Sequence, residues 1–356
     1  MDRGVTSYIA AFLTGILIAR YINLYTPMLL LITGLLLALI VVLKRAVHPI
    51  RFIIFAHLVF LLLGMSHFAI NSRSMGLTGT SAPPIREQLS LKLENITGKG
   101  KEHAVLSALT LGCTSELPAD LKRAYSNSGA MHILSLSGLH IGIIYSMVCI
   151  CLSFLNFSYK TKLIKFLLSV SIIFFYAYIT GFSPSVQRAG IMIMVYNLAT
   201  MGNRPPQKYT TLAIASFIIT LLNPDQLFSI GFQLSFAAMV GIIAILPVIE
   251  KSFKMVYPDK LSEYRYLKKG AFAVWGTIAI SVACQITTLP FTMYYFNSSA
   301  PFFLLTNMAV VPLATLILYL FLPVLLLYGV PGIGDFMCNL LVWLLKLMNH
   351  VIEFIG

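Results

Sequence analysis

The sequence predicts an all-α fold, a polytopic integral membrane helix bundle of about 10–11 transmembrane helices. Two observations predict it. Of the 356 residues, 58% are hydrophobic and only 10% are charged, whereas a soluble globular domain carries about 25% charged residues. Apolar runs also recur along the chain at roughly the 20 residues that a helix needs to cross a membrane. So little charge could not cover a water-facing surface, which excludes a purely soluble protein.

The apolar runs give the candidate spans in order. They lie near residues 5–21, 26–43, 51–70, 133–155, 163–181, 185–201, 209–223, 229–249, 270–296, 302–328 and 334–355. The last run carries a polar stripe at helical spacing, formed by Lys346, Asn349, His350 and Glu353. Such a stripe suits an interfacial helix or a pore-lining helix, so it stays open whether residues 334–355 span the membrane.

Lysines and arginines in the short loops predict the orientation, because cytoplasmic loops of membrane proteins are rich in them. Fifteen occupy one set of alternate loops, whereas only Arg20 and Arg188 border the other set. We therefore expect a multi-pass protein with a cytoplasmic N-terminus. The chain then divides into an N-terminal three-helix membrane segment 1–70, an extracytoplasmic segment 71–131 and a membrane domain 132–356.

The outward-facing segment is the one stretch with soluble character. After a linker rich in small residues, three short helices are predicted near residues 85–96, 102–111 and 118–129. The first follows Pro83-Pro84 and has apolar residues at helical spacing. Amphipathic helices that lead into a span lie on the membrane surface or cap the bundle, and we expect that role here.

Acidic residues are missing from the predicted spans between about residues 5 and 328, where Asp225 and Glu250 lie only at helix ends. Ion-coupled transporters generally need an intramembrane carboxylate, so this pattern argues against a coupled pump. It suits a conduit for polyanions, which a buried carboxylate would repel. The five cysteines show no metal-ligand spacing, and we expect neither a metal nor a cofactor.

Polar residues gather at the predicted outer ends of five helices, whereas polar side chains used only for packing would be spread more evenly. Together they predict a polar vestibule on one side of the membrane. Its candidate residues are His132, Ser135, Ser137, His140, Ser183, Ser185, Arg188, Gln233, Ser235, Gln285, Thr288 and Asn307.

The start of the predicted helix 185–201 has the features of an anion site. Ser183 is a good N-cap and Pro184 suits the first helical position. The exposed amide groups of such a helix end attract phosphate. Arg188 adds a guanidinium that can fork onto phosphate oxygens. The alternative is an arginine whose head group reaches the lipid headgroups.

His132 and His140 are eight residues apart, about 80° around a helix, with Ser137 between them. A metal pair is disfavoured because no third ligand is apparent. A serine nucleophile with a histidine base is also disfavoured, because Ser137 and His140 would lie three residues apart on one helix. We favour hydrogen bonds between helices or a polar pore lining.

Several of these motifs, in order and in register across roughly residues 85–325, resemble the competence region of the ComEC family. They are Ala108–Gly112 with Leu117-Pro118, His132–His140, Tyr178–Ala189, Asn223-Pro224 with Gly231–Phe236, Thr288–Pro290 with Tyr295-Phe296, and Asn307 with Val311-Pro312.

The resemblance implies the bacterial inner membrane and passage of one strand of transforming DNA while the complementary strand is degraded outside. It also implies a surface DNA receptor, a nuclease domain or protein, and a cytoplasmic helicase-like motor as partners. Many family members carry an OB-type domain and a metallo-β-lactamase-like domain, for which this sequence has neither the room nor the motif. We therefore expect a stand-alone channel core or a truncated protein.

The sequence thus predicts a non-enzymatic channel core for uptake of single-stranded DNA, with DNA and membrane lipids as contacts. Two alternatives remain. One is a transporter or flippase for a smaller anionic solute or lipid. The other is an intramembrane Ser/His hydrolase.

Overall fold

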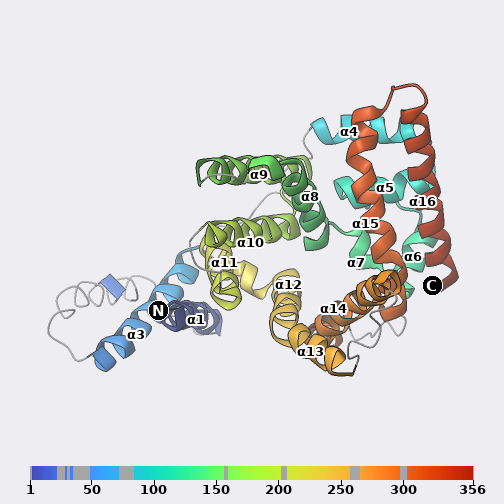
Figure 1. Ribbon diagram of the computed structural model, residues 1–356. Helices are drawn as coiled ribbons and strands as arrows, with labels where there is room; N and C mark the ends of the chain where they lie inside the picture. Colours follow the sequence, from blue (N-terminus) through green and yellow to red (C-terminus); the bar gives the residue numbers. More distant parts are fainter. Residues whose placement is uncertain are drawn as a thin grey trace. The chain divides into compact units, whose positions relative to one another are not determined.

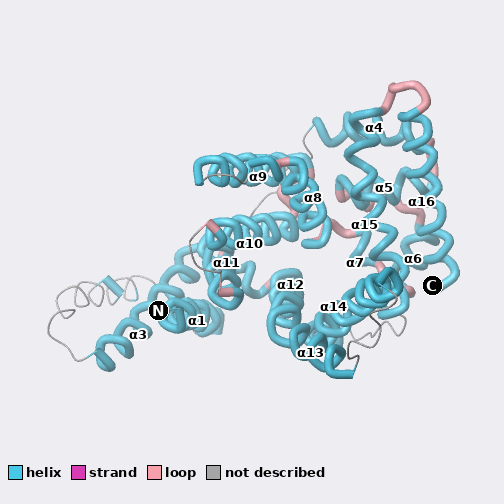
Figure 2. Tube along the Cα trace, in the orientation of Figure 1, coloured by secondary structure: helices cyan, strands magenta, loops and turns pink. Residues whose placement is uncertain are grey.

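The computed structural model describes residues 2–21, 29, 33–34, 49–71, 84–155, 159–201, 207–256, 265–296 and 303–355. Throughout this part of the chain the regular structure is helical (Figures 1 and 2). The predicted span 26–43 lies almost entirely outside it. The chain forms two compact units, one from Met1–Gly79 with Ile191–Gln233 and the other from Thr80–Gly190 with Leu234–Gly356.

The first unit is organised by a close crossing of two helices. Its elements are α1 (Asp2–Tyr21), α3 (Pro49–Asn71), most of α10 (Pro184–Thr200), α11 (Lys208–Leu222), η2 (Pro224–Phe228) and the start of α12 (Ile230–Val240). A Cβ at Gly15 would overlap the carbonyl oxygen of Leu61, and one at Gly64 would overlap that of Phe12. These glycines therefore let the backbones of α1 and α3 touch, as small residues do between membrane helices.

One of the two arginines at the predicted outer loops is neutralised in this unit. The guanidinium of Arg20, at the end of α1, lies 3.8 Å from the carboxylate of Asp225 in η2. It also stands over the ring of Phe228, 4.9 Å from the centroid. The carboxylate of Asp225 and the ring of Phe228 thus both stabilise the positive charge of Arg20, which explains why a cation is tolerated at the end of α1.

The second unit contains the short helices and the remaining spans. Its elements are α4 (Pro84–Thr97), α5 (Lys101–Leu111), α6 (Ala119–Asn127), α7 (Met131–Leu134), α8 (Gly138–Cys151), η1 (Ser153–Leu155), α9 (Tyr159–Ile179), the first turns of α10, the rest of α12, η3 (Gly241–Ile245), α13 (Leu246–Val256), α14 (Arg265–Phe296), α15 (Phe303–Leu327) and α16 (Ile333–Ile355).

The helices α15 and α16 lie side by side, and α4, α5 and α6 pack against this pair (Figure 1). The three short helices begin and end within a few residues of the predicted positions, which confirms them. The role expected for them, on the membrane surface or as a cap of the bundle, stays a prediction. In α5, residues His103 to Leu111 are all buried. The reason is that its middle is apolar around the whole circumference, a pattern of a core helix rather than an amphipathic one.

Two polar contacts tie the short helices to α16. Lys101 Nζ lies 2.7 Å from Glu353 Oε1, and Tyr125 donates to Asn349 Oδ1 at 3.2 Å. The hydrogen bond and the charge of Glu353 raise the pKa of Lys101 above its ordinary value of 10.5. The polar stripe of α16 is therefore used in part to bind α5 and α6, an outcome that the sequence analysis did not foresee.

Among the described residues, six helices are long and apolar enough to cross a membrane. They are Gly4–Tyr21, Lys160–Ile179, Ile230–Ser252, Trp275–Tyr295, Thr306–Leu327 and Ile333–Ile355, and shorter apolar helices occupy Ala56–Asn71, Gly138–Cys151 and Lys208–Leu222. The predicted all-α, polytopic membrane bundle is confirmed. One span differs from its prediction, because residues 133–155 form no continuous helix.

Another span changes helical type part-way along. The predicted span 229–249 corresponds to α12, the π-helical turn η3 and α13 in direct succession. A Cβ at Gly241, in that turn, would overlap the carbonyl oxygen of Ala283 and lie 2.6 Å from Thr287 Oγ1 on α14. The π-turn therefore coincides with the closest approach of two helices, where only glycine fits.

Replacing Tyr125 by Phe should lower the free energy of unfolding by about 1–2 kcal/mol, because the buried Asn349 amide would lose its partner. Asn349 Nδ2 already has no partner among the described residues. Thermal unfolding of the solubilised protein measures the loss. The double variant Y125F/N349L should recover much of it, since removing both polar partners leaves nothing unsatisfied. A double variant less stable than Y125F would contradict this account.

Candidate functional site

The predicted span 133–155 is broken near its start. The helix α7 ends at Leu134, Ser135 and Ser137 have extended backbones (ψ 137° and 169°), and α8 begins at Gly138. His132 and His140 therefore do not share one helix, and the expected 80° relation between them is wrong. Non-helical backbone at membrane depth is tolerated only inside protein or along a cavity. The break also creates a helix N-terminus at Gly138.

Ser137 and His140 form the cap of that N-terminus. His140 Nδ1 accepts from the backbone N–H of Ser137 at 3.1 Å and lies 2.8 Å from its hydroxyl. Because the backbone amide can only donate, Nδ1 is the acceptor and the hydroxyl donates to it as well. His140 Nε2 is buried without a partner among the described residues. The serine–histidine contact is thus accounted for by a capping box, a local device that satisfies a helix end.

The helix α10 begins as the sequence predicts, at Pro184 with Ser183 immediately before it. The connection from α9 is a tight turn in which Gly181 and Phe182 both have positive φ, 69° and 51°. Gln187 closes the turn by donating to the carbonyl oxygen of Phe182 at 2.6 Å. Ser183 and Ser185 face each other, with their hydroxyl oxygens 3.4 Å apart.

Arg188 occupies the second turn of α10 and is buried, with 6% of its surface exposed. Its Nε has no hydrogen-bond partner, and no ion pair joins its guanidinium to another described residue. Arg188 differs in this from Arg20, which is half exposed and paired. The alternative of an arginine whose head group reaches lipid headgroups does not fit so deep a burial.

The two helix starts lie together. A Cβ at Gly138, the first residue of α8, would stand 3.8 Å from the Cβ of Ala189, which follows Arg188. Of the predicted residues, the structure therefore brings together Ser137 and His140 on one side and Ser183, Ser185 and Arg188 on the other. We call these five residues the Arg188 site. Two positive helix ends and one guanidinium, to which no carboxylate of the described residues is paired, make this site suited to an anion.

The remaining predicted residues are used differently. His132 and Ser135 are exposed, and each bonds to a nearby backbone carbonyl, at 2.9 and 3.0 Å. Thr288 donates to the carbonyl oxygen of Cys284 within its own helix, at 2.9 Å. Asn307 is buried and its Oδ1 has no partner within the described chain.

Three further candidates are half-buried side chains, namely Ser235, Gln285 and Gln233. Gln233 belongs to the first unit, where its amide donates to the carbonyl oxygen of Leu227 at 3.4 Å. Its relation to the Arg188 site therefore stays a prediction, as do the roles of Ser235 and Gln285.

A second arginine was missed by the sequence analysis. Arg86 lies in the first turn of α4, and its Nε is buried without a partner in the described structure. Its Nη1 lies 4.0 Å from a Cβ placed at Gly181, and its Nη2 lies 3.7 Å from one placed at Gly112. The guanidinium is thus next to the α9–α10 turn. The sequence feature that could have revealed Arg86 is a cation in the first turn of a predicted helix, a position that the helix dipole disfavours.

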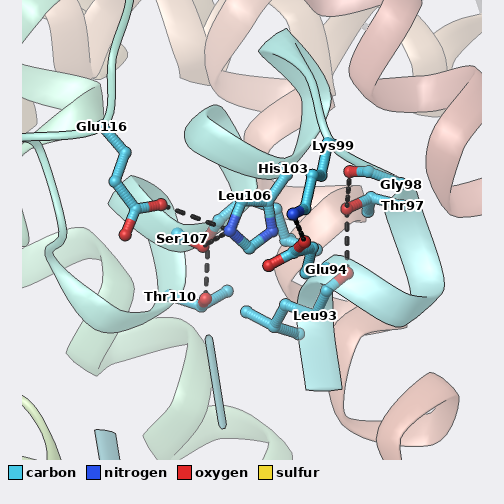
Figure 3. Close-up of polar contacts among 10 residues, drawn as sticks. All are labelled: Leu93, Glu94, Thr97, Gly98, Lys99, His103, Leu106, Ser107, Thr110 and Glu116. Atoms are coloured by element: carbon cyan, nitrogen blue, oxygen red, sulfur yellow. Dashed lines mark hydrogen bonds and ion pairs between the residues drawn. The ribbon is translucent and has the colours of Figure 1, made fainter. Parts of the chain in front are cut away.

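Arg86 also lines an open pocket of about 840 Å³ between α4, α5 and the loop 112–118. Figure 3 shows the polar contacts on α4, α5 and this loop. His103 Nε2 lies 3.2 Å from Glu116 Oε2 and 3.4 Å from the hydroxyl of Ser107. Glu94 Oε1 lies 3.2 Å from Lys99 Nζ. These carboxylates are therefore already engaged by other basic groups.

Comparison with known proteins decides the family. The family model described as Competence protein matches residues 109–356. The chain belongs to this competence protein family. The resemblance seen in the motifs is thereby confirmed, and it associates the chain with natural competence and DNA uptake.

Two relatives are considerably longer. ComE operon protein 3 of Bacillus subtilis (strain 168) is 27% identical over 211 residues, which cover 59% of this chain and 24% of that protein. An uncharacterized protein of Aquifex aeolicus (strain VF5) is 29% identical over 137 residues, 38% of this chain and 31% of that protein. The matches thus cover less than a third of each relative. No solved structure matches the chain.

Replacing Ser137 by Ala should lower the free energy of unfolding by about 1 kcal/mol, because the start of α8 loses its cap. Thermal unfolding measures this, with Ser135→Ala, an exposed serine two residues earlier, as the matched control. A serine-reactive probe should leave Ser137 unlabelled. Labelling of Ser137 that Ser135→Ala preserves and Ser137→Ala abolishes would contradict the capping role and favour the hydrolase alternative.

Proposed function

We propose that this chain forms the membrane channel core through which one strand of DNA is taken up, and that the Arg188 site contacts the phosphates of that strand. The observation that carries the proposal is the buried guanidinium of Arg188, unpaired among the described residues and adjacent to two helix N-termini. Membership in the competence family supports DNA as the source of the phosphates.

The physical argument concerns the cost of a buried charge. Removing an ion from water costs several kcal/mol even after relaxation, and a partner is needed to offset it. Arg20 has such a partner in Asp225, whereas Arg188 has none in the described structure. A phosphodiester would supply the missing negative charge and two oxygens for the guanidinium fork. The amide groups at the starts of α8 and α10 would add neutral donors.

The proposal assigns no chemistry to the chain itself. We expect it in the bacterial inner membrane with the N-terminus in the cytoplasm, in contact with membrane lipids. A surface DNA receptor, a nuclease domain or protein, and a cytoplasmic helicase-like motor would act with it. The motor would give direction to the transport, while the channel core would select for the polyanion.

A transporter or flippase for a smaller anionic solute or lipid would bind its substrate through the same positive charge of Arg188. The two functions differ in what competes for the site. A short single-stranded oligonucleotide should compete for a channel that contacts successive phosphates, whereas a small-anion carrier should prefer the free anion.

Replacing Arg188 by Gln should reduce uptake of labelled DNA about tenfold or more in cells that depend on this protein, because one charge-assisted phosphate contact is lost. Its abundance, measured by immunoblot, should stay within about twofold, since Arg188 has no ion pair to lose. The matched control is Arg20→Gln, which removes the other outer arginine and should leave uptake per molecule unchanged. A loss of uptake that only parallels a loss of abundance would assign Arg188 a structural role.

A further inference from the structure

We propose that Arg86 is a second phosphodiester-binding side chain, which acts from the open pocket between α4, α5 and the loop 112–118. The proposal rests on the proposed function for the source of the phosphate, a DNA strand. The position of Arg86, its lack of a partner and the composition of the pocket carry it.

The position of the guanidinium depends on two glycine turns. Gly112 ends α5 with φ 73°, and Gly181 starts the α9–α10 turn with φ 69°. A Cβ at Gly112 would lie 3.7 Å from one terminal nitrogen of Arg86, and a Cβ at Gly181 would lie 4.0 Å from the other, both at ordinary contact distance. A side chain at Gly112 would also collide with Leu136, whose Cδ1 would be 2.6 Å away. The turns thus place the guanidinium beside the segment that leads to Ser183 and Pro184.

No contact within the described structure compensates the positive charge of Arg86. A cation in the first turn of a helix opposes the helix dipole. Glu87 is its sequence neighbour but is exposed and makes no ion pair with it, as adjacent helical residues point in different directions. Three carboxylates, those of Glu87, Glu94 and Glu116, line the same pocket. Glu94 lies 3.2 Å from Lys99 Nζ and Glu116 lies 3.2 Å from His103 Nε2. No ion pair joins any of the three to Arg86 within the described structure. Among the described residues the guanidinium therefore lacks a countercharge.

The pocket offers room and donors for a phosphodiester. Its volume of about 840 Å³ exceeds what one inorganic phosphate fills, and it is open to the outside. Hydroxyl groups of Ser90, Thr114 and Ser115 line it together with Arg86. A guanidinium binds two phosphate oxygens in a fork and hydroxyls can donate to the others. These groups lie outside the described helices that are long and apolar enough to cross a membrane, and the experiment below distinguishes a nucleic-acid phosphate from a lipid headgroup.

The test measures binding of a short fluorescent single-stranded oligonucleotide to the full chain in nanodiscs of neutral lipid. Replacing Arg86 by Gln should weaken binding about tenfold at low salt. It should also reduce the slope of log affinity against log salt concentration by about 0.7, as expected for one lost contact with a single strand. Arg86→Lys should keep the slope but bind more weakly, because it keeps the charge and loses the fork.

Lys92→Gln is the matched control, because Lys92 is an exposed cation on the same helix and does not line the pocket. It should change neither affinity nor slope appreciably. The melting temperature of each variant shows that the fold is intact, and if Arg86→Gln does not fold, Arg86→Lys carries the test through its affinity.

Equal affinity and slope for wild type and Arg86→Gln would overturn the inference. If Arg188→Gln still weakens binding in that case, the proposed function stands without Arg86. If neither arginine matters, both proposals fail. Two competitors test the source of the phosphate. Displacement of the oligonucleotide from Arg86 by millimolar inorganic phosphate, at constant ionic strength, would assign the site to a free anion. Displacement by anionic vesicles, at equal phosphate concentration, would assign it to lipid.

Discussion

The buried guanidinium of Arg188 is the constraint on which the account of this protein depends. A cationic residue with only 6% of its surface exposed needs a counterion, a set of strong acceptors or an external ligand. The described residues supply no ion pair to it, and its surroundings add the positive ends of α8 and α10 rather than negative groups. The imbalance therefore involves the backbone as well as one side chain, and we propose that an anion resolves it.

The other charged and polar groups of the described chain show that such an imbalance is unusual here. Arg20 has Asp225, Lys101 has Glu353, and His103 has Glu116. The first two contacts join the end of one helix to another helical segment, and the third joins α5 to the loop that follows it. Arg86 and Arg188 follow the opposite pattern, since each is next to a helix N-terminus and lacks a carboxylate.

Local rules predicted much of the fold from the sequence. Pro83-Pro84 and Pro184 marked the starts of α4 and α10, because capping depends on a few neighbouring residues. The break at residues 135–137 was missed, because Ser, Leu and Ser interrupt hydropathy too weakly to separate a helix from an extended turn. The burial of α5 and the partners of Asn349 and Glu353 depend on contacts between segments more than 200 residues apart. Arg86 was missed because its neighbours Gly112 and Gly181 lie in turns 26 and 95 residues further along the chain.

The most direct measurement is an experimental structure of the full chain with a bound single-stranded oligonucleotide. The account predicts a phosphate of that strand within about 2.7–2.9 Å of the Arg188 guanidinium nitrogens, the range of charge-assisted hydrogen bonds. It also predicts further phosphate oxygens facing the amide groups that begin α8 and α10. A strand bound elsewhere, with Arg188 paired to a carboxylate of the protein or to a lipid headgroup, would contradict it.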